Sequence, residues 1–176
     1  MTGLAEPLSG FLESSLISRV RRNHGLEHAT LHILAERHSG RPLAGHSDWR
    51  GFWIVGDLET ADLQIAVNEA LLRLNSGESQ LAIHPFCGTN FVTAGVLAGG
   101  AAALAMFGTG RRLQDKLERL PLAMSLATLA LIFAQPLGMT LQRQVTTSGA
   151  PGGLRVVSIL PKARGSVKTH RIITEG

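Results

Sequence analysis

The chain has 176 residues, about one domain in length, and a net charge of +4. Hydrophobic residues make up 44% of it and charged residues only 17%, below the roughly 25% of an ordinary soluble domain. The basic residues are not interleaved with aromatic ones and tyrosine is absent, so the composition argues against a nucleic-acid-binding protein and favours contact with anionic lipid headgroups.

The first predicted element is a helix over residues 10–38, where apolar residues recur every three or four positions. It contains His24-Gly25-Leu26-Glu27-His28, which has the form H-x-x-E-H, the inverted zinc-protease motif. Positions four apart lie about 40° apart around a helix, so His24 and His28 can share one metal ion. Glu27 lies on the same side and can take a proton from a water bound there. A motif this short also arises by chance.

Two other residues of this helix carry information. Gly25 costs about 1 kcal/mol relative to alanine inside a helix, which indicates that another part of the backbone approaches closely there. His32 continues the four-residue spacing from His28, but it has turned about 80° away from His24. We therefore interpret His32 as a secondary or structural histidine.

The next segment is predicted to mix strands with one helix. Residues 42–57 contain aromatic and β-branched residues bounded by glycines, which indicates a β-hairpin or two short strands. A helix follows over residues 60–74, capped by Thr60 or Asp57. Its Glu69 is spaced to pair with an arginine and is a weaker candidate for a metal ligand. Residues 80–84 are predicted to form a strand that ends at His84.

A second cluster, His84-Pro85-Phe86-Cys87-Gly88-Thr89-Asn90, adds two side chains that can bind a metal ion. The H-x-x-C spacing allows His84 and Cys87, the only cysteine, to approach the same ion. If both joined the two helix histidines, the site would be closed and structural; with three ligands, one position would stay open for catalysis. Thr89 or Asn90 is expected to cap the helix that follows.

Two long stretches are free of charged residues. No Asp, Glu, Lys or Arg lies between Glu78 and Arg111, and a second such run covers residues 120–141. Each run is close to the 17–25 residues that cross a bilayer as a helix. The first run contains Gly95-x-x-x-Gly99, a pattern typical of close helix contact in lipid. The alternative is a buried helical hairpin in a large soluble oligomer. The basic connector between the runs and the basic tail leave the membrane orientation open.

The tail is predicted to return to strands, at residues 154–159 and 167–174, which complete the sheet begun by residues 42–57. The expected fold is therefore α+β: a small mixed metal-binding domain with an inserted two-helix transmembrane hairpin. The expected parts are residues 1–90 with the metal motifs, the hairpin at residues 91–141, and a basic tail at residues 142–176.

The two motifs, in this order and at this separation, resemble those of the YqhQ-like bacterial membrane proteins. The matching residues are His24-Gly25-Leu26-Glu27-His28 and His84-Pro85-Phe86-Cys87-Gly88-Thr89, and the resemblance covers about residues 20–110. It implies a metal-dependent enzyme of the bacterial cytoplasmic membrane without an established activity. This chain departs from the family in being short, with one predicted hairpin where more spans would be expected.

The leading hypothesis is a membrane-embedded zinc-dependent hydrolase, most plausibly a metallopeptidase acting on a peptide or protein. His24 and His28 would bind Zn²⁺ or another divalent transition metal, Glu27 would be the general base, and His84 or Cys87 would complete the ligands. One alternative is a zinc-stabilised membrane assembly protein without enzyme activity. Another is a thiol enzyme with Cys87 as nucleophile. The expected partners are the lipid bilayer and further copies of this chain.

Overall fold

The computed structural model describes residues 10, 12–164 and 167–176. The chain divides into two compact units. The first, the α+β unit, consists of Met1–His84 and Arg143–Gly176. The second, the helical hairpin, consists of Pro85–Gln142 and is inserted into the first in sequence.

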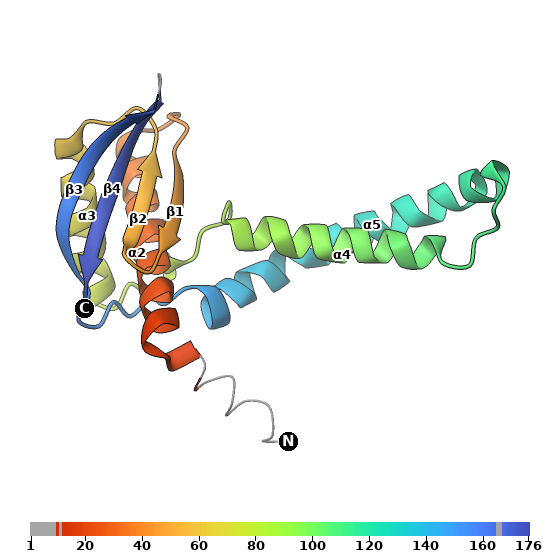
Figure 1. Ribbon diagram of the computed structural model, residues 1–176, viewed down its shortest axis with the longest axis horizontal. Coiled ribbons are helices and arrows are strands. Elements are labelled where there is room, and N and C mark those ends of the chain that lie inside the picture. Colours follow the sequence, from red (N-terminus) through yellow and green to blue (C-terminus); the bar gives the residue numbers. More distant parts are fainter. Residues whose placement is uncertain (1–9, 11, 165–166) are drawn as a thin grey trace. The chain divides into compact units, whose positions relative to one another are not determined.

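The α+β unit contains one four-stranded antiparallel sheet (Figure 1). Its strands are β1 (Ala44–Asp48), β2 (Gly51–Val55), β3 (Arg155–Arg164) and β4 (Val167–Glu175), in the order β1-β2-β4-β3. The central pairing joins β2 to β4 and sets Phe52 opposite Ile172. Strands from before and after the inserted hairpin therefore share one sheet, which confirms the predicted α+β fold and the completion of the sheet by the tail.

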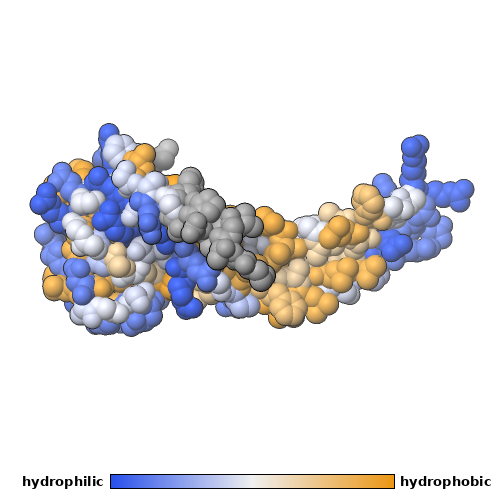
Figure 2. Space-filling model, turned by 90° about the horizontal axis from the view of Figure 1, so that it is seen from below, coloured by the Kyte–Doolittle hydropathy of each residue, from blue (hydrophilic) through white to orange (hydrophobic). Residues whose placement is uncertain are grey.

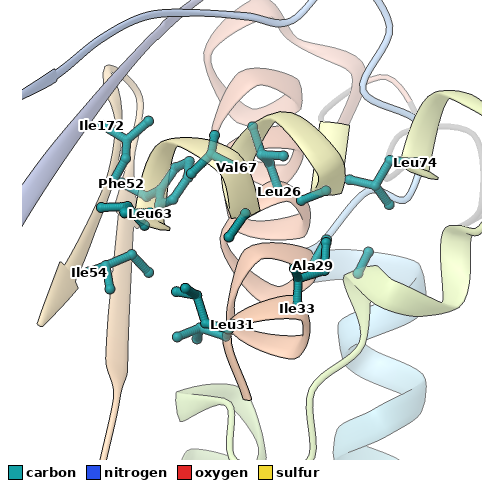
Figure 3. Close-up of a cluster of buried hydrophobic side chains, with 14 of the residues drawn as sticks. Leu26, Ala29, Leu31, Ile33, Phe52, Ile54, Leu63, Val67, Leu74 and Ile172 are labelled. Atoms are coloured by element: carbon teal, nitrogen blue, oxygen red, sulfur yellow. The ribbon is translucent and has the colours of Figure 1, made fainter. Parts of the chain in front are cut away.

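Two helices, α2 (Ser15–Arg37) and α3 (Thr60–Asn75), cover one face of this sheet (Figure 1). Both have an apolar side that faces the strands, as their three- and four-residue spacings require. The resulting core is shown in Figure 3. Its buried residues come from both helices, the central strands and the connections: Leu26, Ala29, Leu31, Ile33, Leu34, Phe52, Ile54, Leu58, Leu63, Ala66, Val67, Ala70, Leu74, Ala82, Leu154 and Ile172. This packing fixes the side of α2 that carries His24 and His28.

Two local predictions in the α+β unit are wrong. The segment before His84 is a 3₁₀ helix, η1 (Ser79–Ala82), and not a strand, because its amides bond within the segment instead of to a neighbouring strand. The cap of α3 is Glu59, which makes no side-chain cap bond. Thr60 is engaged elsewhere, since its hydroxyl lies 3.1 Å from Nε2 of His170, and Asp57 pairs with Lys168 at 2.8 Å.

The helical hairpin consists of α4 (Gly88–Met106) and α5 (Leu113–Leu141), which lie side by side (Figure 1). Cys87 caps α4, because its sulfur accepts the amide N–H of Thr89 at 3.4 Å. The expected cap at Thr89 or Asn90 is therefore wrong by two or three residues. The Asn90 amide donates to the carbonyl of Pro85 at 2.7 Å. After α5 the chain continues as a short π-helix, η2 (Gln142–Thr146).

Both hairpin helices are long and apolar enough to cross a membrane. Only 6% and 11% of the residues in their most apolar windows are buried, so their apolar side chains face outwards. Figure 2 shows the hydrophobic surface along the hairpin and the hydrophilic tip. A β-carbon added at Gly95 or Gly99 would meet no described atom within 4 Å. The predicted small-residue contact is therefore not made with α5 of the same chain.

Candidate metal centre

The centre is built on one side of α2. The rings of His24 and His28, one helical turn apart, lie edge to face with centroids 4.4 Å apart. A ring nitrogen of each lies within 4.8 Å of one on the other, close enough for one ion to bridge them. His28 is 2% exposed, and His24 is half-buried. The spacing that predicted a shared face for these two residues thus produces adjacent imidazoles.

Both imidazoles are oriented by backbone carbonyls. Nδ1 of His24 lies 2.9 Å from the carbonyl oxygen of Thr146, and Nδ1 of His28 lies 2.7 Å from that of Ala82. A carbonyl can only accept, so Nδ1 carries the proton in each ring and the lone pair is on Nε2. A histidine that binds a metal through one nitrogen usually donates from the other in this way.

His84 joins this cluster from the end of η1. Its ring centroid lies 5.6 Å from that of His28 and 4.9 Å from that of His32. Nε2 of His32 is bound to the carbonyl oxygen of Ile83 at 2.8 Å, so His32 also steadies the backbone next to His84. Burial, together with the neighbouring charges of His32 and His28, lowers the pKa of His84 to about 4. His84 is therefore neutral at pH 7, the form that binds metal ions.

Glu27 is held by strand β1. Its side chain is almost fully buried, and the hydroxyl of Ser47 donates to its carboxylate. A β-carbon at Gly45 would lie 2.7 Å from Cγ of Glu27, so β1 leaves room for this side chain only by having glycine there. Burial raises the pKa of Glu27, against the opposing effects of the Ser47 hydrogen bond and of the charges of His24 and His46.

The lack of a side chain at Gly25 allows the backbone that carries the two orienting carbonyls to approach α2 closely. A β-carbon at this position would clash with the carbonyl oxygen of Ser148 and lie 3.2 Å from the β-carbon of Ala82. The backbone after α5 and the end of η1 thus both press against α2 beside the histidines. The close backbone approach expected from the sequence is confirmed.

A protein-family model matches the part of the chain that carries this centre. The model of a domain of unknown function, DUF6391, covers residues 19–159. The chain belongs to the DUF6391 family. It is also 39% identical over 143 residues to an uncharacterised protein of Picosynechococcus sp. strain PCC 7002, an alignment that covers 73% of this chain and 66% of that protein. No solved structure matches. The resemblance to the YqhQ-like proteins stays a prediction based on the two motifs.

In this DUF6391 chain Cys87 belongs to the helical hairpin. The other three candidate metal ligands, His24, His28 and His84, belong to the α+β unit. Cys87 is 5% exposed and is tethered to His84 through Pro85 and Phe86 alone. Three peptide links span at most about 11 Å, so the thiol is a ligand candidate by its position in the chain.

Other candidates of the DUF6391 chain lie outside the cluster. Glu69 is bound to Arg37 at 2.5 Å and to Arg73 at 2.7 Å, so it forms ion pairs and the weak ligand prediction has no support. His38, which was not a predicted ligand and caps the C-terminus of α2, has its Nε2 3.6 Å from a carboxylate oxygen of Asp62.

Several partners of the DUF6391 centre were missed by the sequence analysis. Gly45 and Ser47 carried no signal, because a single hydroxyl and a glycine in a strand fit many roles. The carbonyls of Thr146 and Ala82 have no side-chain signature at all. His46 is an exposed residue of β1 whose charge acts on Glu27.

Proposed function

We propose that this protein is a membrane-bound metal-dependent hydrolase whose ion, Zn²⁺ or another divalent transition metal, is held by His24 and His28. The observation that carries the proposal is the pair of Nδ1–carbonyl hydrogen bonds, which give both adjacent rings the tautomer that binds metal through Nε2. Histidines that served only the core would need no such shared orientation. Two imidazole ligands also suit Zn²⁺ among the common divalent ions.

The third ligand is His84 or Cys87. His84 is supported by its ring, which lies beside that of His28, and by its neutral state. Cys87 is supported by its short tether to His84 and by the affinity of a thiolate for zinc. A site with one of them has a position for water, whereas a site with both is closed.

In the proposed reaction Glu27 is the general base. A bound Zn²⁺ supplies Lewis acidity and lowers the pKa of water from its bulk value. Glu27 accepts the proton of the attacking water and returns it to the leaving group of a peptide or protein substrate. Ser47 and Gly45 hold the carboxylate in place, and its raised pKa brings it closer to neutral pH, where a base that must also act as an acid is most effective.

The location we propose is the bacterial cytoplasmic membrane, with α4 and α5 as its two spans. Their outward-facing apolar residues need a partner, and lipid is the one that length and charge exclusion favour. A second copy of this chain is the further partner, because the open face at Gly95 and Gly99 suits helix contact between copies.

Two other functions have an observation in their favour. Because Ser47 already binds the Glu27 carboxylate, Glu27 can instead be a group that only shapes the cluster, and the metal would then stabilise a membrane assembly protein. Because Cys87 stands at the N-terminus of α4, a thiol enzyme is the other candidate. Neither accounts for the H-x-x-E-H spacing as directly as a hydrolase does.

An open coordination position is what separates a hydrolase from a zinc-stabilised protein. The detergent-purified chain would be loaded with Co²⁺, whose visible spectrum reports its ligands, and titrated with acetohydroxamate, a chelating mimic of the hydrolytic transition state. We expect the spectrum to change in the native chain and in Glu27→Gln. A Co²⁺ spectrum that acetohydroxamate does not alter would show a closed site and contradict the hydrolase.

Glu27→Gln also tests the role of the base. With a fluorescent casein substrate and zinc-loaded protein, we expect the variant to keep its metal and lose at least about 100-fold in rate, the usual contribution of a general base. Glu69→Gln is the matched control, since it removes a half-buried carboxylate from α3 outside the cluster. Equal rates for native protein and Glu27→Gln would remove Glu27 from the reaction.

A further inference from the structure

We infer that a cleft beside the histidine cluster is a binding site for a phosphate group, and that its natural source is the headgroup of an anionic phospholipid. The cleft lies in the α+β unit and has a volume of about 610 Å³. Two arginines, Arg21 of α2 and Arg143 of η2, line it together with Ser79 and Ser148. The inference does not depend on whether the histidines bind a metal.

The charged residues that line the cleft are all basic. No acidic residue is among the residues that line it, and Glu78, between Gly77 and Ser79 in the chain, is not one of them. Neither Arg21 nor Arg143 forms an ion pair with any residue in the described part of the chain. One N–H of Arg21 donates to the carbonyl of Gln144 at 3.1 Å, which steadies the guanidinium without neutralising it. Two uncompensated guanidinium groups favour an anion with several acceptor oxygens.

The rest of the wall supports the same ligand. Gly149 lies against Ser79, where an added β-carbon would come within 2.8 Å of the Ser79 backbone, so the lining includes main chain and hydroxyls. Leu74 and Ile83 add apolar surface to the same lining. A polar, cationic part next to an apolar part matches a headgroup that continues into acyl chains. The volume also exceeds what an inorganic ion alone would fill.

The position of Arg143 in the chain favours a lipid source. It comes two residues after Leu141, the last residue of α5, in the π-helix that ends the second helix long and apolar enough to cross a membrane, Leu113–Thr146. An arginine at the end of a spanning helix reaches the headgroup layer by covalent continuity alone. A soluble phosphate compound would reach the same guanidinium groups from the water side, so the chemistry is shared and the source must be measured.

The cleft adjoins the metal centre through two of its own residues. Ile83 precedes His84 and accepts the hydrogen bond of His32, and Thr147 follows Thr146, whose carbonyl orients His24. An anion bound in the cleft therefore lies next to the backbone that positions the histidines.

The test is a binding measurement on the full-length protein in a neutral detergent. A fluorescent short-chain phosphatidylglycerol would be displaced by four competitors: dioctanoyl phosphatidylglycerol, glycerol phosphate, inorganic phosphate, and dioctanoylglycerol, which has the chains without the phosphate. The variants are Arg21→Gln and Arg143→Gln. The control is Arg155→Gln, an exposed arginine of β3 that loses the same charge elsewhere.

We expect each cleft variant to weaken phosphatidylglycerol binding about tenfold, the effect of losing one charge-assisted hydrogen bond, and the control to leave it unchanged. Displacement by the lipid but only weakly by inorganic phosphate supports the headgroup as the source. Strong displacement by inorganic phosphate supports the phosphate site and reassigns its source to a soluble compound. The inference would be overturned if dioctanoylglycerol displaced the probe as well as dioctanoyl phosphatidylglycerol does. It would also be overturned if Arg21→Gln and Arg143→Gln bound the probe as tightly as Arg155→Gln does.

Discussion

The carbonyl oxygen of Ser148 lies so close to Gly25 that the β-carbon of any other residue at that position would clash with it. The amide of Ser148 also donates to the carbonyl of Arg21 at 2.9 Å, so this short segment lies along α2. Two residues earlier, Thr146 supplies the carbonyl that orients His24. The absence of a β-carbon at Gly25 therefore lets the backbone of residues 146–148 lie against α2, where Thr146 orients the ring of His24.

Replacing Gly25 by alanine tests this coupling. Alanine alone would favour the helix by about 1 kcal/mol, but the added methyl group meets a backbone carbonyl that cannot rotate away. We expect a net loss of about 2 kcal/mol in the free energy of unfolding, typical of overpacking, and weaker metal binding because Thr146 is displaced. Urea unfolding followed by tryptophan fluorescence measures the first effect, and a zinc titration measures the second.

Gly153→Ala is the control for this change, since a β-carbon there meets nothing within 4 Å. It should leave both measurements at the native values. A Gly25→Ala chain as stable as the native protein and equally able to bind zinc would show that the contact with Ser148 does not position the site.

A second prediction concerns the pH dependence of stability. Burial alone would raise the pKa of Asp48, but hydrogen bonds from the Arg171 guanidinium at 2.7 Å and from the Arg50 amide, with the charges of Arg171 and His46, together lower it. The folded pKa thus lies below the unfolded value of about 3.9. The stabilisation is present above about pH 4 and is lost as the pH falls through the lower, folded pKa.

Asp48→Asn should remove this dependence. Because the Asp48 side chain is 38% exposed, we expect its pH-dependent contribution to be no more than about 1 kcal/mol. The midpoint of urea unfolding should fall more between pH 6 and pH 3 in the native protein than in Asp48→Asn. Asp62→Asn, a partly exposed position on α3, should keep the native slope. Identical slopes for native protein and Asp48→Asn would rule out a stabilising role for the Arg171 pair.

A third prediction concerns the two apolar helices. If α4 and α5 span the bilayer, the tip between them and the α+β unit lie on opposite sides. In a Cys87→Ser background, single cysteines at Gln114, in the exposed first turn of α5, and at Arg155 on β3 would be treated with a membrane-impermeant maleimide in sealed vesicles. We expect one position to react at once and the other only after detergent is added. Immediate reaction at both would contradict a spanning hairpin.

The sequence predicted the elements whose signals are local and periodic. The 3.6-residue pattern located α2 and α3, and the β-branched segments at both ends located the strands. The Gly25 anomaly was a correct guide because a glycine in a helix is costly unless something needs the space. The charge-free runs similarly located both hairpin helices.

The failures share a physical cause. The segment Ser79–Ala82 was expected to be a strand, yet its few residues can bond within a tight turn as easily as with a neighbour. Glu69 was a possible ligand until tertiary packing brought Arg37 to it, and Ser47 gained importance only because β1 lies against α2. Contacts between segments far apart in the chain decide such roles, and no local pattern encodes them.

The central claim is that His24 and His28 hold a metal ion, and elemental analysis of the detergent-purified protein tests it most directly. The set is native protein, His24→Ala, His28→Ala, Glu27→Gln and Cys87→Ser, with His38→Ala as a control outside the cluster. We expect close to one zinc per chain in the native protein, Glu27→Gln and His38→Ala, and none in His24→Ala or His28→Ala; loss in Cys87→Ser would add the thiol to the ligands. A native protein that carries no metal after purification without chelator, or a His24→Ala chain that keeps it, would contradict the account.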